Sequence, residues 1–216
     1  MDEKTKTIKI LVLGDNCTGK TALVDRYFKG TFYDSHFATI GIEYKTINVT
    51  SDTDRYSLQI WDASGNRNFY KFVRSYYDIV DGVIVTYDVC NYNSYLHTKD
   101  WMNGLRPSMP KLLVGCKSDS TMPKAVSSGD ALLFSRDEGM EFIETSSKED
   151  RFVIEAFQLI IFQVIKQKYN RVETPFGRDS FYTIHSGENS VISRPSQDIQ
   201  RSCRNYFCFW RKLNDK

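Results

Sequence analysis

The 216-residue sequence predicts an α/β fold of three layers, in which a six-stranded, mostly parallel sheet has helices on both faces. Two observations predict it. Short apolar, β-branched runs alternate along the first 168 residues with segments whose apolar residues recur at helical spacing. The first run, Ile8 to Leu13, also ends abruptly at a glycine-containing loop that a helix pattern follows.

The loop after the first run, GDNCTGKT, fits the pattern G-x-x-x-x-G-K-[ST] with Gly14, Gly19, Lys20 and Thr21 in the fixed places. Such a loop wraps backbone N–H groups around phosphate oxygens, and the next helix points its positive dipole end at them. Lys20 is expected to reach the β/γ-phosphates, and the Thr21 hydroxyl to ligate Mg²⁺. A chance glycine turn is the alternative, which the preceding strand and the following helix pattern disfavour.

The later elements follow in order. Gly30 to Thr39 lacks a clear period and is expected to be a loop. Five further strands are expected at Ile42–Val49, Tyr56–Trp61, Gly82–Tyr87, Leu112–Gly115 and Glu141–Ile143. A polar turn joins the first two of these as a hairpin. Helices are expected at about Ser94–Leu105, Asp130–Arg136 and Asp150–Lys168, the last packing on the sheet.

Composition and charge limit the class of protein. A hydrophobic content of 41% and a charged content of 26% indicate a soluble globular protein with one full-sized core. The net charge of +2 makes no case for nucleic-acid binding, and no nucleic acid is expected as a partner. From Tyr169 onward the periodicity fails and Pro, Gly and Ser are scattered. The sequence therefore predicts a domain at residues 1–168 and a disordered tail at residues 169–216.

The cysteines and the N-terminus indicate the compartment. Five cysteines without C-x-x-C spacing suggest neither a disulfide framework nor a zinc site, so a reducing, cytoplasmic setting is expected. The first residues contain no apolar signal region, and no apolar run approaches the length of a membrane span. We expect a monomer.

The motifs, in their order and spacing, resemble the Ras superfamily of small GTPases, most closely the Rab family, over about residues 5–168. Rab-like stretches are IGIEY at residues 40–44, LQIWD at residues 58–62 and SYY at residues 75–77. The resemblance implies a P-loop NTPase fold, binding of GTP and GDP with Mg²⁺, GTP hydrolysis and a role in vesicle transport. It also implies effector, exchange-factor and activating proteins that bind the two switch loops.

The resemblance also implies residue roles. Phe32 would lie against the guanine base, and the Thr39 hydroxyl would complete the Mg²⁺ shell only when a γ-phosphate is present. Asp62 would hold Mg²⁺ through water, and the Gly65 N–H would bond the γ-phosphate. Loss of that phosphate would free both loops, which is an order–disorder switch. The implied metal ligands are Thr21, Thr39 and Asp62, and the implied catalytic residues are Lys20, Gly65 and Asn66.

At the base, the Asp119 carboxylate would accept two hydrogen bonds from guanine, which adenine cannot offer. Lys117 would pack its stem along the nucleotide, and a backbone N–H of the loop at residues 146–148 would meet the guanine carbonyl. Taken singly, Phe32 could be a loop anchor, Asp119 a helix cap and Ser147 a turn residue. Their common order behind a phosphate loop favours the nucleotide site. The full expected nucleotide-binding set is Gly14, Asp15, Asn16, Cys17, Thr18, Gly19, Lys20, Thr21, Ala22, Phe32, Thr39, Gly65, Cys116, Lys117, Asp119, Ser146, Ser147 and Lys148.

Several residues depart from the family pattern. Asn66 replaces the glutamine that orients the attacking water, and its side chain is one methylene shorter, so slow intrinsic hydrolysis is predicted. Asn16 replaces a glycine of Ras and is expected to crowd an incoming arginine finger. Ala63 and Ser64 replace the usual Thr-Ala pair, with no predicted effect. Cys116 replaces the asparagine of the NKxD motif, so guanine selectivity should survive while affinity falls and exchange quickens.

The tail departs most from the Rab pattern. Neither C-a-a-X nor a terminal cysteine pair is present, because Cys208 is followed by FWRKLNDK. Residues 201–216 interleave basic and aromatic side chains, which suits peripheral contact with an anionic membrane, aided by palmitoylation at Cys203 or Cys208. A solvated tail is the alternative.

Three functions remain open. The first is an enzyme switch that cycles between GTP and GDP, and the second is a GTP-binding interaction module with little or no hydrolysis. Asn66 is the residue that divides them. The third, an inert homologue without nucleotide, is disfavoured by the intact phosphate-binding and Mg²⁺-binding residues.

Overall fold

A computed structural model describes residues 5–35, 37–50, 55–169, 184–186 and 190–191. Its strands are β1 (Lys6–Leu13), β2 (Ile42–Thr50), β3 (Arg55–Ala63), β4 (Gly82–Asp88), β5 (Lys111–Cys116), β6 (Glu141–Glu144), β7 (Ile184–Ser186) and β8 (Ser190–Val191). Its helices are α1 (Lys20–Lys29), the 3₁₀ helix η1 (Arg67–Phe69), α2 (Tyr70–Arg74), α3 (Tyr92–Leu96), α4 (Thr98–Met102), α5 (Ser128–Asp137) and α6 (Val153–Tyr169).

The strands form one sheet in the order β6-β5-β4-β1-β3-β2-β7-β8. Strands β6, β5, β4, β1 and β3 are parallel, and β2 pairs antiparallel with β3 as the expected hairpin. The expected six-stranded, mostly parallel sheet is thus confirmed. β3 lies on one side of β1 and β4 lies on the other, so the strand order reverses at β1. In open α/β sheets a ligand-binding crevice is expected at the carboxyl ends of the strands at such a point.

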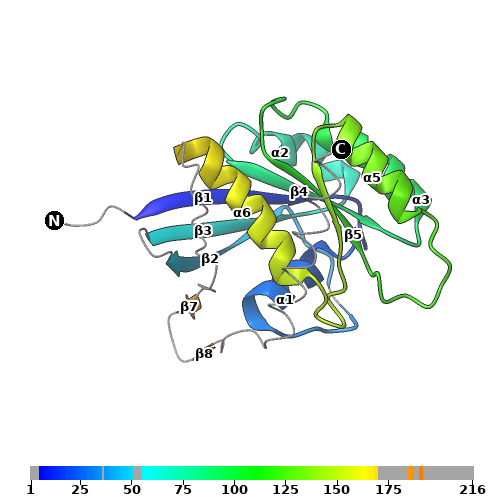
Figure 1. The fold of residues 1–216 in the computed structure, drawn as a ribbon, viewed down its shortest axis with the longest axis horizontal. Helices are drawn as coiled ribbons and strands as arrows, with labels where there is room; N and C mark the ends of the chain where they lie inside the picture. Colours follow the sequence, from blue (N-terminus) through cyan, green and yellow to red (C-terminus); the bar gives the residue numbers. More distant parts are fainter. Residues whose placement is uncertain (1–4, 36, 51–54, 170–183, 187–189, 192–216) are drawn as a thin grey trace, which may run out of the picture.

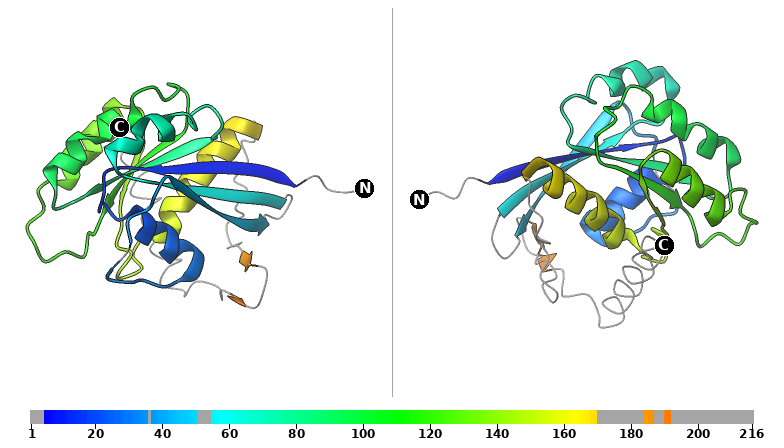
Figure 2. Two further views of the ribbon diagram at one scale, coloured as in Figure 1. Left: turned by 180° about the vertical axis from the view of Figure 1, so that it is seen from behind. Right: turned by 45° about the horizontal axis from the view of Figure 1, so that its top comes forward.

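Helices cover both faces of the sheet, and the side chains of β1 alternate between them. Ile8, Ile10 and Val12 belong to a core with α1 and α6, whereas Leu11 and Leu13 belong to a core with α2 and α4. Figure 1 shows α1 and α6 on the near face, and the view from behind in Figure 2 shows the other helices on the opposite face. The three-layer prediction is confirmed.

Local differences from the sequence pattern fall at short elements. The helix expected at residues 94–105 is two short helices, α3 and α4, which meet at His97. The helices expected from Asp130 and Asp150 correspond to α5 and α6. The pattern does not indicate η1 and α2, which follow β3, because they total fewer than three helical turns.

The C-terminal segment adds two short strands that the pattern does not indicate. α6 ends at Tyr169, beside the predicted domain boundary. β7 then pairs antiparallel with the outer edge of β2 at Asn48 and Val49, and β8 pairs with β7. The predicted disorder of residues 170–183, 187–189 and 192–216, and the membrane prediction for residues 201–216, lie outside the described residues. No helix in the described part of the chain has both the length and the apolar character needed to cross a membrane.

Candidate nucleotide-binding site

The predicted motifs follow the carboxyl ends of strands that lie side by side. Residues 14–19 follow β1, residues 62–66 include the end of β3, residues 116–119 include the end of β5, and residues 145–148 follow β6. Because these strands are parallel, their carboxyl ends form one edge of the sheet. The fold therefore brings together motifs that are far apart in the sequence (Figure 1).

The phosphate loop has a conformation that requires its first glycine. Gly14 has φ 138°, and a Cβ there would lie 2.4 Å from the Thr86 carbonyl oxygen. The buried Thr18 hydroxyl is 2.7 Å from that of Thr86, which ties the loop to β4. Asn16 and Cys17 are exposed at the tip. The loop opens into α1, whose first turn, including Ala22, has no acidic side chain, so its N–H groups suit an anion.

Lys20 places its ammonium group inside this loop. The side chain is buried, and its Nζ donates a 2.7 Å hydrogen bond to the backbone oxygen of Asp15. Burial lowers the pKa of Lys20, and the carboxylate of Asp62 opposes that shift. A buried cation in a loop that ends a strand and begins a helix is suited to bind phosphate oxygens.

Three oxygen-bearing side chains converge next to Lys20. The Thr21 hydroxyl donates a 2.6 Å hydrogen bond to Asp62 Oδ2, and the Thr39 hydroxyl is 3.0 Å from that of Thr21. Asp62 Oδ1 is buried and has no hydrogen-bond partner among the described residues. Burial also raises the pKa of the Asp62 carboxyl against the opposing effects of Thr21 and Lys20. An unsatisfied carboxylate oxygen beside two hydroxyls fits a hard cation such as Mg²⁺.

The loop after β3 (residues 64–66), which is the predicted second switch loop, lies against the phosphate loop. A Cβ on Gly65 would lie 2.4 Å from the backbone of Asp15 and Asn16, so only glycine allows this approach. Next to it, Asn66 Oδ1 accepts a 2.9 Å hydrogen bond from the backbone N–H of Asn68 and caps η1. The amide carbonyl of Asn66 is therefore already occupied within its own loop.

Two of the predicted base-binding segments, residues 116–119 and 146–148, lie in adjacent loops. Asp119 Oδ1 accepts a 2.6 Å hydrogen bond from the Ser146 hydroxyl, which joins the loop after β5 to the loop after β6. The ammonium of Lys117, a residue with φ 62°, pairs with Asp88 at 2.7 Å. Phe32 is half-buried in the loop after α1.

Arg26, in the middle of α1, is a residue that the motifs do not reveal. Its guanidinium donates hydrogen bonds to the backbone oxygens of Ser147 at 2.6 Å, Lys148 at 3.0 Å and Gly30 at 2.6 Å. It therefore fixes the predicted base loop to the helix that begins at the phosphate loop. No sequence signal could have found its role at the base loop, because its partners there, Ser147 and Lys148, contribute main-chain atoms more than a hundred residues away.

Cys116 is buried at the junction of the phosphate and base loops. Burial raises the pKa of its thiol to about 12, so the neutral thiol is the form present. The neighbouring Thr145 hydroxyl is buried and has no hydrogen-bond partner among the described residues. The Cys116 thiol beside it is a weak hydrogen-bonding group, and its weak interaction with this hydroxyl opposes the rise in the thiol pKa.

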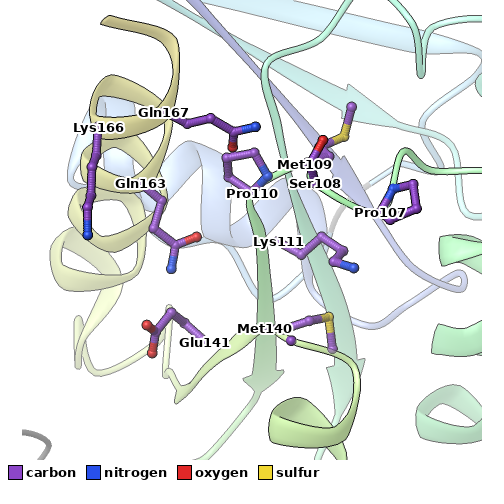
Figure 3. A pocket seen from close by; sticks show the side chains of 11 residues that line it. Pro107, Ser108, Met109, Pro110, Lys111, Met140, Glu141, Gln163, Lys166 and Gln167 are labelled. Atoms are coloured by element: carbon purple, nitrogen blue, oxygen red, sulfur yellow. The ribbon is translucent and has the colours of Figure 1, made fainter. Parts of the chain in front are cut away.

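A separate cavity of about 510 Å³ lies at the other end of the sheet, near the amino ends of β5 and β6. Figure 3 shows Gln163 of α6 directed toward Glu141, while Lys111 points away from that carboxyl. Burial raises the pKa of Glu141 to about 7, and Gln163 opposes that shift. None of the predicted nucleotide-binding residues lines this cavity.

Comparisons of the sequence with known proteins identify its family. Residues 9–166 match the model of the Ras family. The Ras-related proteins RABD2b and RABD2c of Arabidopsis thaliana are each 39% identical over 153 residues, covering 69% of this chain and 76% of theirs. The GTP-binding protein YPTM2 of Zea mays is 37% identical over 153 residues, covering 69% of this chain and 75% of its own. The chain therefore belongs to the Ras family of small GTPases and is Rab-related.

Proposed function

We propose that this protein is a Rab-like switch that binds Mg-GTP and GDP, changes its effector binding with the nucleotide, and hydrolyses GTP slowly by itself. The observation that carries the proposal is the convergence of Lys20, Thr21, Thr39 and Asp62 at the end of the phosphate loop. Membership of the Ras family implies GTP and GDP binding with Mg²⁺ and GTP hydrolysis.

In this proposal different residues bind the phosphates, the metal ion and the base of the nucleotide. The amides of residues 14–19 and Lys20 bind the phosphates, and Thr21, Thr39 and Asp62 hold Mg²⁺, which neutralises phosphate charge when bound. Asp119, held by Ser146, reads the guanine base. The Gly65 N–H meets the γ-phosphate, and Thr39 joins the metal only in the GTP state, so nucleotide state sets the order of both switch loops.

The arrangement of Asn66 supports slow hydrolysis. A water-orienting amide must direct its carbonyl oxygen at the attacking water. In this chain the Asn66 oxygen accepts the Asn68 N–H at 2.9 Å, and the side chain is shorter than glutamine. Orienting water would therefore require breaking the cap of η1 and extending the reach of the side chain. The same contact favours the second candidate function, a GTP-binding interaction module with little or no hydrolysis.

Single-turnover hydrolysis of bound GTP tests the proposal in the native chain, Asn66→Gln and Asn66→Ala. We expect Asn66→Gln to hydrolyse GTP at least tenfold faster, since positioning of a reacting group is worth an order of magnitude or more. Asn66→Ala separates the candidates. A native rate well above that of Asn66→Ala supports a slow cycling switch, and equal rates support the interaction module. A native chain as fast as Asn66→Gln would contradict slow hydrolysis.

An aromatic surface between the switch loops supports effector binding as the output. Tyr44 stacks on Trp61 with ring centroids 5.4 Å apart, and Tyr76 contacts both Trp61 and Phe72 at 5.3 Å. Tyr44 remains 63% exposed, and Ile40, which follows the switch residue Thr39, is 79% exposed. Exposed aromatic clusters of this kind are typical of protein interfaces.

The role in membrane traffic rests on the Rab resemblance and on the basic-aromatic segment at residues 201–216. Fractionation of cells that express the chain with and without these residues tests peripheral membrane contact. We expect the truncated chain to leave the membrane fraction, and equal membrane association would contradict a role for the segment.

A further inference from the structure

The Asp15 side chain of the phosphate loop is held by the segment where α3 and α4 meet. Its Oδ2 atom is 2.5 Å from His97 Nδ1, and its Oδ1 atom accepts a 2.8 Å hydrogen bond from Trp101 Nε1. An ionised carboxylate can only accept, so His97 Nδ1 carries the hydrogen of this contact. One carboxylate thus joins the phosphate loop to a helix pair that contributes no nucleotide-binding motif.

The backbone of the same residue organises the inside of the loop. The Asp15 carbonyl oxygen accepts hydrogen bonds from Lys20 Nζ at 2.7 Å and from the Thr18 hydroxyl at 3.0 Å. The backbone of Asp15 also lies against Gly65, where no Cβ would fit. A shift of Asp15 would therefore move the Lys20 ammonium and the contact with the second switch loop together.

The two residues that hold Asp15 differ in what else they do. Trp101 is 1% exposed, belongs to the hydrophobic core, and accepts a 2.5 Å hydrogen bond at its backbone oxygen from the Tyr77 hydroxyl. The His97 side chain is 34% exposed and belongs to none of the hydrophobic clusters of the described residues. Packing explains Trp101, whereas the His97 ring is partly exposed and makes its hydrogen bond with Asp15.

We propose that His97 is a positioning residue that, through Asp15, keeps the phosphate loop closed around the nucleotide and so slows nucleotide release. This inference rests on the proposed nucleotide binding. The contact links the α3–α4 segment to the dwell time of GDP and GTP.

The test is the dissociation rate of a fluorescent GDP from the full chain with saturating Mg²⁺, in the native protein, His97→Leu and His97→Asn. Leucine keeps the branched shape without a donor, and the asparagine Nδ2 occupies the place of histidine Nδ1. We expect His97→Leu to release GDP about five- to tenfold faster, as for a lost hydrogen bond to a partly exposed charge. His97→Asn should stay within about twofold of native, as a retained donor requires.

Tyr77→Phe is the matched control, because it removes a hydrogen bond to the same helix without touching Asp15. It should lower the melting temperature and leave the GDP release rate unchanged. Native release rates in His97→Leu, or equally faster rates in His97→Leu and His97→Asn, would overturn the positioning role. A native chain that releases no nucleotide on denaturation would instead contradict the proposed function itself.

Discussion

Cys116 lies directly against Gly19 of the phosphate loop: a Cβ on this glycine would stand 3.3 Å from the Cβ of Cys116 and 3.7 Å from its Sγ. The phosphate loop and the predicted base loop after β5 therefore contact each other at the side chain of Cys116. Beside it, the Thr145 hydroxyl lacks a hydrogen-bond partner in the described part of the chain. Because a thiol is a weak hydrogen-bonding group, this contact gives only a weak polar link between the predicted base loops and the phosphate loop.

Replacing Cys116 with asparagine should strengthen that link. The amide can donate and accept near Thr145 and the phosphate loop, so GDP release from Cys116→Asn should be about three- to tenfold slower than native, the worth of one hydrogen bond. Stopped-flow release of fluorescent GDP measures the rate. Cys90→Ser, which changes a thiol outside the site, should release GDP at the native rate. Native or faster release from Cys116→Asn would contradict the prediction.

Thr21 and Thr39 should differ in the nucleotide state that they affect. Thr21→Ala removes a hydroxyl that hydrogen bonds Asp62 and that would bind Mg²⁺ in both nucleotide states, so it should weaken retention of GDP and GTP about tenfold each. Thr39→Ala should weaken only GTP retention. Release rates of GDP and of a non-hydrolysable GTP analogue, measured across a Mg²⁺ titration, distinguish the two. Equal effects of Thr39→Ala on both nucleotides would refute the assigned role of Thr39.

Gly65→Ala should uncouple GTP binding from hydrolysis. The added Cβ would stand 2.4 Å from the backbone of Asp15 and Asn16, so the second switch loop must withdraw from the phosphate loop. We expect GDP retention near native and single-turnover hydrolysis reduced at least tenfold, since loop positioning governs the reaction. Gly129→Ala is the control, because its Cβ meets only an ordinary 3.7 Å contact. Native hydrolysis by Gly65→Ala would show that this approach is dispensable.

Glu141 should make stability depend on pH. Its pKa rises from 4.5 to about 7 on folding, so the folded chain binds the extra proton and stability is lost as the pH rises from about 4.5 through 7. Glu141→Gln removes this loss. At pH 8 the variant should be more stable than native by about 1–2 kcal/mol after allowance for solvent screening, and at pH 4.5 the difference should shrink. Urea unfolding at both pH values, with saturating GDP, measures it. A variant less stable than native at pH 8 would be the contrary result.

The six main strands and the phosphate loop follow from local patterns. Ile8, Ile10 and Val12 alternate with Leu11 and Leu13 because the central strand packs against helices on both faces, and that leaves a continuous apolar run in the sequence. The glycines of the loop are visible because a crowded, left-handed backbone admits little else. Such features are encoded by neighbouring residues and can be read from them.

The contacts that organise the site could not be read in this way. Neither His97, between α3 and α4, nor Arg26 belongs to a motif. Both act on partners that only the sheet topology brings close. The cap that Asn66 forms on η1 depends on a turn that the pattern does not indicate. The pairing of β7 with the edge of β2 joins segments far apart in the sequence. Long-range polar contacts of single side chains have no periodicity, so sequence reasoning misses them.

Through the guanidinium of Arg26, α1 is connected to the predicted base loop as well as to the phosphate loop. The first turn of the helix continues the phosphate loop, and Arg26, less than two turns on, holds the main chain of the loop that faces the base. One helix would thus support the residues that bind both the phosphates and the base of a bound nucleotide. A protein that displaces the first turn of α1 would therefore weaken the contacts to the phosphates and to the base together. Such a protein would not need to contact the base itself.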